Sequence, residues 1–206
     1  MLVSLCAAGC AREVGPPESP PDSPPASPPE QQHPAADGHE LVGRALPEWT
    51  FSDWSGSEPL TLASLRGKVV VVRFWTTDCP YCDKTMPALE ALWGELRDQP
   101  VVFVGAFHDK PPGSHPDMKR ALESVAVWKV SFPIAFDRGW KTLDAWWLGS
   151  AHRHATSATF VIGKDGKVAF VHPGPVFHPS DDPSEADANR GYREIRQAIE
   201  RAIALP

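Results

Sequence analysis

Cys79 and Cys82 are the residues of this chain best suited to chemistry, because only Pro80 and Tyr81 separate them. At this spacing the second sulfur can reach the first, so a mixed disulfide with a substrate can be resolved within the same chain. The same spacing is also half of many zinc sites. No further cysteine pair or histidine pair follows at the spacing of a zinc finger, and the remaining two cysteines lie at the extreme N-terminus. The pattern therefore favours a redox dithiol over structural zinc.

The residues around the two cysteines predict how they are positioned. A run of β-branched residues over 68–75 predicts a strand, residues 76–78 a turn, and the periodic stretch from Cys79 to Trp93 a helix. The dithiol then lies at a helix N-terminus, where unpaired backbone N–H groups and the helix dipole favour a thiolate. We expect Cys79 to be the more exposed nucleophile and Cys82, one turn into the helix, to be the buried resolving cysteine.

Several motifs flank the dithiol at characteristic distances. Phe74-Trp75 precedes Cys79 by three intervening residues, Pro87 follows it by eight, and the segments 60–68 and 159–168 lie further out. Together these motifs resemble the thioredoxin superfamily, in particular its extracytoplasmic TlpA/ResA-like (redoxin) branch, over about residues 43–205. The resemblance implies an α/β protein with the three-layer thioredoxin-like fold, in which helices flank a central mixed β-sheet.

The same resemblance implies an activity and a set of site residues. It implies a thiol–disulfide oxidoreductase that exchanges disulfides with extracytoplasmic protein substrates and with a separate redox partner, as a monomer that uses neither cofactor nor metal. Cys79 and Cys82 are the implied catalytic residues. The residues implied to line the substrate groove are Trp75, Pro80, Tyr81 and, on the facing loop, Ser157.

Ser157 is also a departure from that family, which has a cis-proline facing the cysteine pair at this position. A cis bond before a residue other than proline costs about 2.5–4 kcal/mol, so we expect a trans bond or a rearranged loop. Loss of the proline would either widen the choice of substrate and expose the thiolates to a metal, or mark a domain with weak disulfide exchange.

A second departure is Arg73, which stands where thioredoxins have a buried Asp. A cation near the dithiol would lower the pKa of a cysteine thiol, and Asp78, adjacent to Cys79, is the other charged residue that could tune the thiolate. Alternatively, Arg73 points to the outside of the sheet and pairs with a carboxylate such as Asp78 or Asp137. The sequence leaves both interpretations open.

Two other functions compete with disulfide exchange. A peroxiredoxin-like thiol peroxidase would have the motif Pro-x-x-x-Thr-x-x-Cys; Thr76 fits it, but position 72 is valine. A metal-binding or partner-binding module with little turnover would use the same surface, and His152 and His154 precede the Ser157 loop closely enough to approach the cysteines. We expect these two residues to be ordinary loop histidines.

The remainder of the chain has a mixed α/β pattern. It predicts strands over 101–107 and 132–137, helices over 117–127 and 140–148, and a hairpin of 156–162 with 167–172 turned by residues 164–166. The helical spacing of Ile195, Ala198, Ile199, Ala202 and Ile203 predicts a closing amphipathic helix.

The N-terminus has a different composition. Residues 1–10 are apolar and end in small residues before Cys10, which resembles a lipoprotein lipobox with Cys10 as the lipid-bearing residue, although the stretch is short and lacks a basic start. We expect 1–10 to be the remnant of a lipoprotein signal, 11–42 a proline-rich disordered linker and 43–206 the thioredoxin-like domain, held outside the cytoplasm or in the periplasm. This expectation implies a start site upstream of Met1. The alternatives are a truncated or misassigned start and an uncleaved apolar N-terminus in the cytosol. The formal net charge of −6 gives no electrostatic case for nucleic acid.

Overall fold

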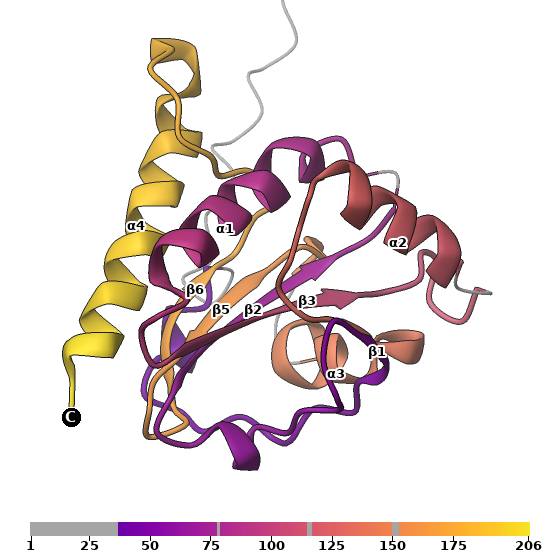
Figure 1. The fold of residues 1–206 in the computed structure, drawn as a ribbon, viewed down its shortest axis with the longest axis horizontal. Coiled ribbons are helices and arrows are strands. Elements are labelled where there is room, and N and C mark those ends of the chain that lie inside the picture. The colour runs from indigo at the N-terminus through magenta and orange to yellow at the C-terminus, as the bar shows by residue number, and fades with distance from the viewer. Residues whose placement is uncertain (1–36, 78, 115–116, 150–152) are drawn as a thin grey trace, which may run out of the picture. The chain divides into compact units, whose positions relative to one another are not determined.

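A six-stranded mixed sheet in the order β1-β4-β3-β2-β5-β6 forms the centre of the computed structural model, which describes residues 37–77, 79–114, 117–149 and 153–206 (Figure 1). The strands are β1 (Ser52–Ser55), β2 (Val69–Trp75), β3 (Val101–Phe107), β4 (Ile134–Phe136), β5 (Thr159–Ile162) and β6 (Val168–His172). β2, β3 and β4 are parallel, whereas β1, β5 and β6 pair antiparallel with their neighbours. The predicted mixed sheet is confirmed, with β1 as an additional edge strand.

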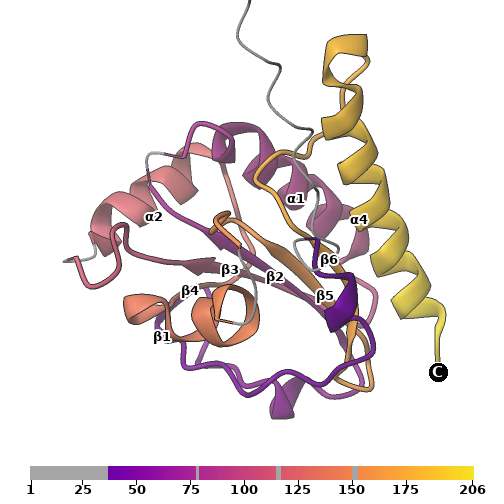
Figure 2. The same ribbon diagram turned by 180° about the vertical axis from the view of Figure 1, so that it is seen from behind.

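Helices cover both faces of this sheet. They are α1 (Cys82–Leu96), α2 (Met118–Val127), α3 (Lys141–Leu143) and α4 (Ala186–Ala204). α1, α2 and α4 pack on one face and α3 on the other, as Figures 1 and 2 show from opposite sides. The short helix expected over 140–148 is present from Lys141 to Leu148, where α3 passes directly into a π-helical turn over Asp144–Leu148.

β2 is buried along its whole length, and its side chains alternate between the two cores. Val71 and Trp75 lie in the core beneath α1, α2 and α4, whereas Val72 and Phe74 lie in the core of the opposite face. Because successive residues of a strand point to opposite faces, Arg73 belongs to the face of Val71 and Trp75. The strand thus directs a cation toward α1, the helix that begins with Cys82.

Residues before position 43 take part in the packing. Leu41 is only 5 % exposed and belongs to the core that contains Trp146 and Trp147. Gly38 has a left-handed φ of 82°, and a Cβ there would come within 2.9 Å of the Trp147 ring. The packed chain therefore begins ahead of the boundary at 43 that the sequence predicts.

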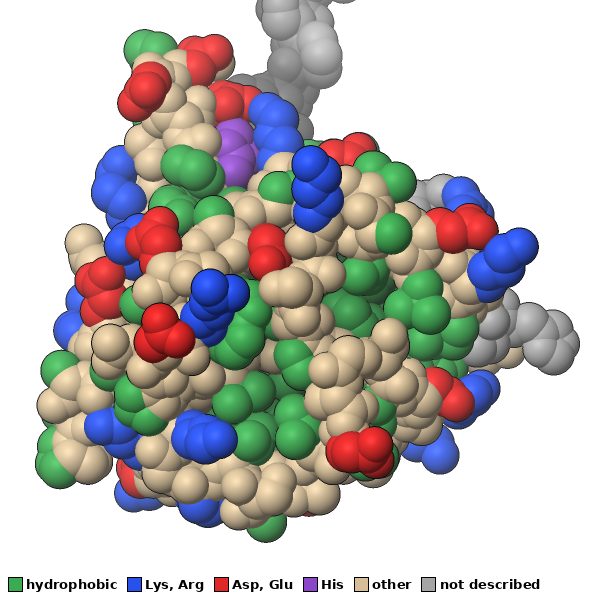
Figure 3. Space-filling view, in the orientation of Figure 1, with side chains coloured by type: hydrophobic (Ala, Val, Ile, Leu, Met, Phe, Trp, Pro, Cys, Tyr) green, Lys and Arg blue, Asp and Glu red, His purple; other side chains and the backbone are tan. Residues whose placement is uncertain are grey.

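The face seen in Figure 3 carries charged side chains of both signs, with hydrophobic side chains in small groups among them. A surface of this kind has no single-sign field that would steer a highly charged partner. None of the helices in the described ranges combines the length and the apolar character that a membrane crossing requires.

Candidate functional site

The two cysteines lie where β2 gives way to α1. α1 begins at Cys82 with Tyr81 as its N-cap, and Cys79 lies in the preceding turn, where its carbonyl accepts a 3.0 Å hydrogen bond from the Cys82 N–H. The helix thus starts three residues later than predicted, and Cys82 is its first residue rather than one turn in. Both cysteines are free thiols; Cys79 is partly exposed and Cys82 is fully buried.

The environments of the two thiols separate their acidities. The pKa of Cys79 is lowered to about 6, first because the Cys82 thiol donates a hydrogen bond to it, and further by backbone N–H groups and by the charge of Arg73. The pKa of Cys82 is raised, because its thiol is the donor of that hydrogen bond and because it is buried. At neutral pH this pair holds a thiolate at the exposed sulfur and a thiol at the buried one.

Cys79 lies between two surface hollows. One has a volume of about 380 Å³, and its lining includes Cys79, Pro80, Tyr81, Lys110, Ser157 and Pro175. The other has a volume of about 400 Å³ and extends toward α2, where Asp83, Arg120 and Trp128 form part of its wall. The Trp128 indole N–H donates a 2.9 Å hydrogen bond to the Asp83 carboxylate, which joins α2 to the start of α1. A polypeptide segment that crosses Cys79 would have space on both sides of the sulfur.

Of the four residues implied to line a substrate groove, three line the first hollow. Pro80 and Tyr81 are exposed there, Tyr81 to 48 %, and Ser157 faces them from the loop before β5. Trp75 does not, and that prediction is wrong: its side chain is 0 % exposed and packs against the rings of Phe107 and Trp128. Trp75 lies on the inward face of β2, so it supports the site from below without reaching its surface.

The loop at Ser157 is ordered by its own contacts. The only cis peptide bond in the described ranges joins Lys110 to Pro111, so the bond before Ser157 is trans, one of the two outcomes that the sequence allows. The residue before it, Thr156, offers its carbonyl to Nε2 of the buried His108 at 3.1 Å. The residue after it, Ala158, accepts a hydrogen bond from the Phe74 N–H at 3.0 Å. The loop is therefore fixed to the ends of both β2 and β3.

Arg73 is buried, with 1 % of its surface exposed, and its guanidinium is held by oxygen atoms that carry no formal charge. Nη1 donates to the carbonyl of Ser157, to Thr159 Oγ1 at 3.1 Å and to the Gly174 carbonyl at 3.2 Å, while Nη2 donates to the Pro175 carbonyl at 3.1 Å. Its Cζ lies 4.9 Å from the centroid of the Phe177 ring. Burial lowers the pKa of the guanidinium, whereas negative charge on Cys82 or Cys79 and a hydrogen bond with the Cys82 side chain raise it.

Asp137, one of the two carboxylate partners suggested by the sequence, is not among the hydrogen-bond partners of Arg73. Asp137 instead accepts hydrogen bonds from the backbone N–H groups of Thr142 and Leu143, at 2.9 and 2.8 Å, and its pKa is raised, chiefly by burial. Asp78 lies outside the described residues, as do Cys10 and His152. The side chain of Arg73 points to the α1 face of the sheet, which is the face of the dithiol.

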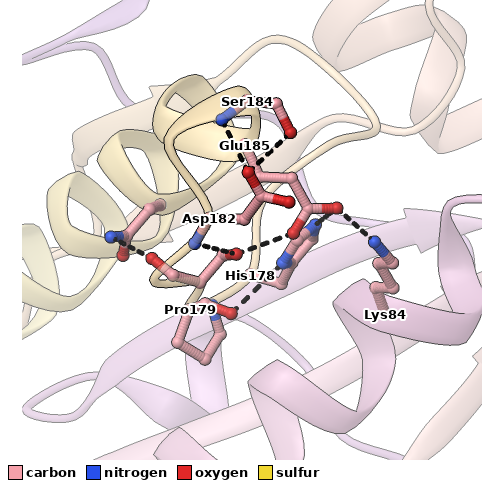
Figure 4. Close-up of polar contacts among 8 residues, drawn as sticks. Lys84, His178, Pro179, Asp182, Ser184 and Glu185 are labelled. Atoms are coloured by element: carbon pink, nitrogen blue, oxygen red, sulfur yellow. Dashed lines mark hydrogen bonds and ion pairs between the residues drawn. The ribbon is translucent and has the colours of Figure 1, made fainter.

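The acceptors Gly174 and Pro175 belong to the segment 173–185 between β6 and α4, here called the strap. The strap is fastened to α1 by an ion pair between Lys84 and Glu185 (Figure 4). Glu185 also accepts a 2.7 Å hydrogen bond from Ser180 and lies 3.8 Å from Nε2 of His178. Sequence reasoning missed the strap, because its prolines predict only an irregular connection and its partners are about a hundred residues away in the chain.

The histidines do not assemble a metal site within the described part of the chain. No group of three or more His, Cys, Asp or Glu side chains there could hold an ion. His154 is exposed and borders the hollow that contains Cys79. His108 and His172 are enclosed, and burial is the main reason why the pKa of each is lowered to about 4.

Comparison with known proteins assigns this geometry to a family. The family model for AhpC/TSA matches residues 42–171, which include β1 to β5, all but the last residue of β6, and Cys79 and Cys82. The chain belongs to the AhpC/TSA family. Among curated proteins it is 30 % identical to the thiol-disulfide oxidoreductase ResA of Halalkalibacterium halodurans over 65 % of this chain and 69 % of that protein. It is 31 % identical to ResA of Geobacillus thermodenitrificans over 65 % of this chain and 70 % of the relative.

Solved structures agree with the fold. A thiol:disulfide interchange protein of the thioredoxin family from Chlorobium tepidum superimposes with a TM-score of 0.57 at 19 % identity, covering 78 % of this chain and 96 % of that one. StoA from Bacillus subtilis superimposes with a TM-score of 0.54 at 16 % identity, covering 75 % of this chain and 98 % of that one. The TlpA/ResA-like resemblance and the thioredoxin-like fold that the sequence predicts are both confirmed.

Proposed function

We propose that this chain is a thiol–disulfide oxidoreductase that exchanges disulfides with protein substrates through Cys79 and Cys82. The observation that carries the proposal is the asymmetry of the pair: a partly exposed Cys79 whose pKa is lowered to about 6 stands beside a buried Cys82 whose pKa is raised. An exposed thiolate and a protected thiol two residues apart are the requirements for attack and for resolution, respectively. The similarity to ResA proteins supports the same activity.

The exchange proceeds in two steps. In the reducing direction the Cys79 thiolate attacks one sulfur of a substrate disulfide, so that a Cys79–substrate disulfide forms and the other substrate sulfur leaves as a thiolate. Cys82 then loses its proton and attacks Cys79, which releases the second substrate thiolate and leaves the Cys79–Cys82 disulfide. In the oxidising direction the same bonds form and break in reverse order.

The substrate segment is proposed to lie in the two hollows beside Cys79. Pro80, Tyr81 and Ser157 line the first hollow, and Tyr81 is 48 % exposed beside the space that Cys79 also lines. Their contacts with a polypeptide would be largely apolar, which suits a site that handles many sequences.

The proposal also covers the localisation of the protein. An N-terminal stretch ending at Cys10, a proline-rich segment and a redox-active dithiol together fit a protein held at the outer side of a membrane by a lipid on Cys10. Lipid labelling of the full chain with an upstream start, compared with a Cys10→Ala variant, tests the anchor: equal labelling of the two would refute it.

Trapping of the mixed disulfide tests the activity. Cys82→Ser removes the resolving sulfur, so it should accumulate a disulfide-linked complex with a protein substrate, whereas Cys79→Ser should form none. Wild-type protein should accelerate insulin reduction by dithiothreitol, with or without a chelator, and should not consume hydrogen peroxide at a comparable rate. Trapping through Cys82, peroxide turnover that exceeds insulin reduction, or a rate that depends on added zinc or copper would overturn the proposal.

A further inference from the structure

We propose that Arg73 sets the direction of disulfide exchange, because its buried positive charge beneath the dithiol stabilises the reduced pair and makes the Cys79–Cys82 disulfide an oxidant of substrate dithiols. This inference rests on the proposed function and adds to it the sense in which electrons move. Arg73 acts through the cysteines, so it is a positioning residue and not a catalytic one.

The position of Arg73 in β2 allows its guanidinium to extend only on the α1 face of the sheet. Arg73 is the fifth residue of β2, and it could point to the opposite face of the sheet only if Val71 and Trp75 also left their core for the opposite one. The opposing residue on β3 is Gly105, and the opposing residue on β5 is Thr159, whose hydroxyl accepts from Nη1. The guanidinium therefore extends on the α1 face, and two of its acceptors, Ser157 and Pro175, line the same hollow as Cys79.

No carboxylate in the described ranges pairs with Arg73. Among the described residues its partners are three backbone carbonyls, one hydroxyl, the Cys82 side chain and the face of Phe177. His172 is a further titratable neighbour, and burial followed by the Arg73 charge keeps its pKa at about 4, so it is uncharged at neutral pH. Glu185 on the strap is engaged with Lys84 on α1. A buried charge held only by dipoles gains most from an opposite charge nearby, and the thiolate of Cys79 supplies one.

That charge exists in only one redox state. When the protein oxidises a substrate dithiol, two substrate thiols become one disulfide, and the two electrons break the Cys79–Cys82 bond. The products are the Cys79 thiolate, the Cys82 thiol and one proton released to solvent. The thiolate attracts the guanidinium, whereas the disulfide it came from does not. Stabilising the reduced form makes a disulfide a stronger oxidant, so Arg73 favours this direction.

An equilibrium measurement on three variants tests the inference. Wild-type protein, Arg73→Met and Arg73→Lys are equilibrated with reduced and oxidised glutathione at pH 7, and the reduced fraction is counted after alkylation. Arg73→Met should lower the equilibrium constant for reduction at least tenfold, which corresponds to about 30 mV. Arg73→Lys, which keeps the charge, should retain most of the wild-type value. Arg97→Met, at the end of α1 far from the dithiol, controls for loss of a surface charge.

An unchanged constant in Arg73→Met, or a shift no larger than that of Arg97→Met, would overturn the inference. If Arg73→Met does not fold, Arg73→Gln, which keeps hydrogen-bond donors but no charge, replaces it and should show the same loss. A destabilisation common to both redox forms cancels in the equilibrium constant, so a structural defect alone does not mimic the effect.

The measurement separates this inference from the proposed function. Glutathione equilibration needs no protein substrate: if Cys82→Ser traps no substrate but Arg73→Met still shifts the constant, disulfide exchange with proteins fails while the role of Arg73 stands. If trapping succeeds and the constant does not move, only the role of Arg73 fails. The wild-type protein should also oxidise a dithiol peptide faster than it reduces the corresponding disulfide, and the reverse order would count against the inference.

Discussion

The guanidinium of Arg73 donates a hydrogen bond to the backbone carbonyl of Ser157, so the two positions at which the sequence departs from the thioredoxin pattern contact each other. Ser157 lines the hollow beside Cys79, and Arg73 lies on the inner face of β2 beneath it. The charge that acts on the dithiol and the loop that faces the dithiol are therefore parts of one hydrogen-bonded unit. We therefore expect a substitution at Arg73 to change the conformation of the Ser157 loop, and a backbone change at Ser157 to change the position of the Arg73 guanidinium.

Alkylation of the reduced protein should label Cys79 before Cys82 and should follow the ionisation of Cys79. Because its pKa is about 6, the rate should rise between pH 5 and 7 and then level off, whereas an ordinary thiol reacts mainly above pH 8. Iodoacetamide labelling at several pH values, with the modified cysteine located by mass spectrometry, provides the measurement. Labelling of Cys82 first, or a midpoint near 8.5, would contradict the assignment of the nucleophile.

The same ionisation makes the stability of the reduced protein depend on pH. The pKa of Cys79 is lower in the folded chain than in the unfolded one, so the unfolded state binds more protons between about pH 6 and 8.5. The unfolding free energy of the reduced form should therefore rise with pH across this window and fall as the pH drops through 6. The oxidised form lacks the thiol and is the control. Parallel pH profiles for the two forms would show that Cys79 is not responsible.

His108 and His172 should make the protein less stable in acid. Each has a pKa of about 4 in the folded state and near 6.5 in the unfolded state, so the unfolded chain binds more protons between pH 4 and 6.5. Each histidine should contribute a loss of up to about 1.4 kcal/mol per pH unit as the pH falls through this window. In His108→Gln and in His172→Gln, the unfolding free energy measured with urea should depend less steeply on pH between 4 and 6.5, by the equivalent of about one bound proton. A pH dependence equal to that of the wild type would contradict the role of that histidine.

Two glycines in helices should respond in opposite ways to alanine. Gly191 in α4 lies so close to β6 that a Cβ would come within 2.6 Å of His172 Nε2, whereas a Cβ at Gly94 in α1 meets nothing within 4 Å. Gly191→Ala should lower the unfolding free energy by about 1–3 kcal/mol through overpacking. Gly94→Ala should raise it by about 0.5–1 kcal/mol through helix propensity. Stabilisation by both changes would mean that α4 packs less closely on β6.

Truncation should locate the start of the folded body between residues 36 and 43. Deletion of 1–36 should leave the thermal midpoint and the soluble dithiol activity unchanged, because the proline-rich composition of that segment cannot support a core. Deletion of 1–42 also removes Leu41, whose burial contributes about 1.5–3 kcal/mol, and the Glu40 carboxylate that pairs with the buried Arg153. The longer deletion should therefore lower the midpoint by several degrees. Equal midpoints would refute the packing of residues 37–42.

The elements that could be predicted from the sequence are those with a strong local period. β2, β3 and α1 follow from runs of β-branched residues and from helical spacing, and the Cys-x-x-C motif then places the dithiol at their junction. The period of β2 does not reveal which side of the sheet α1 covers. Trp75 could therefore be expected at the surface although it is buried, and the two directions for Arg73 could not be separated. The acceptors Gly174 and Pro175 follow from tertiary packing alone, so no local pattern indicates them.

Ser157→Pro tests what the loop gains from lacking a proline. Proline removes the N–H at this position, fixes φ near −65° and makes a cis bond accessible at about 0.5–1 kcal/mol. We expect the variant to fold, its insulin-reductase turnover to hold or rise, and any binding of zinc by the reduced dithiol to weaken, because the ring shields Cys79. Ser157→Ala removes the hydroxyl but keeps the backbone donor, and it should behave like the wild type.

The stability, the insulin-reductase turnover and the zinc affinity of Ser157→Pro should be measured on one sample, together with the pH midpoint of Cys79 alkylation. The Ser157 carbonyl is an acceptor for Arg73. If the peptide bond before the proline becomes cis, that carbonyl should be displaced and the pH midpoint of Cys79 alkylation should rise. If this peptide bond stays trans, the pH midpoint should not change. Loss of turnover in Ser157→Pro but not in Ser157→Ala would show that substrate binding needs the N–H of residue 157. A proline variant identical to the wild type in stability, turnover, zinc affinity and midpoint would show that Ser157 does not face the dithiol during exchange.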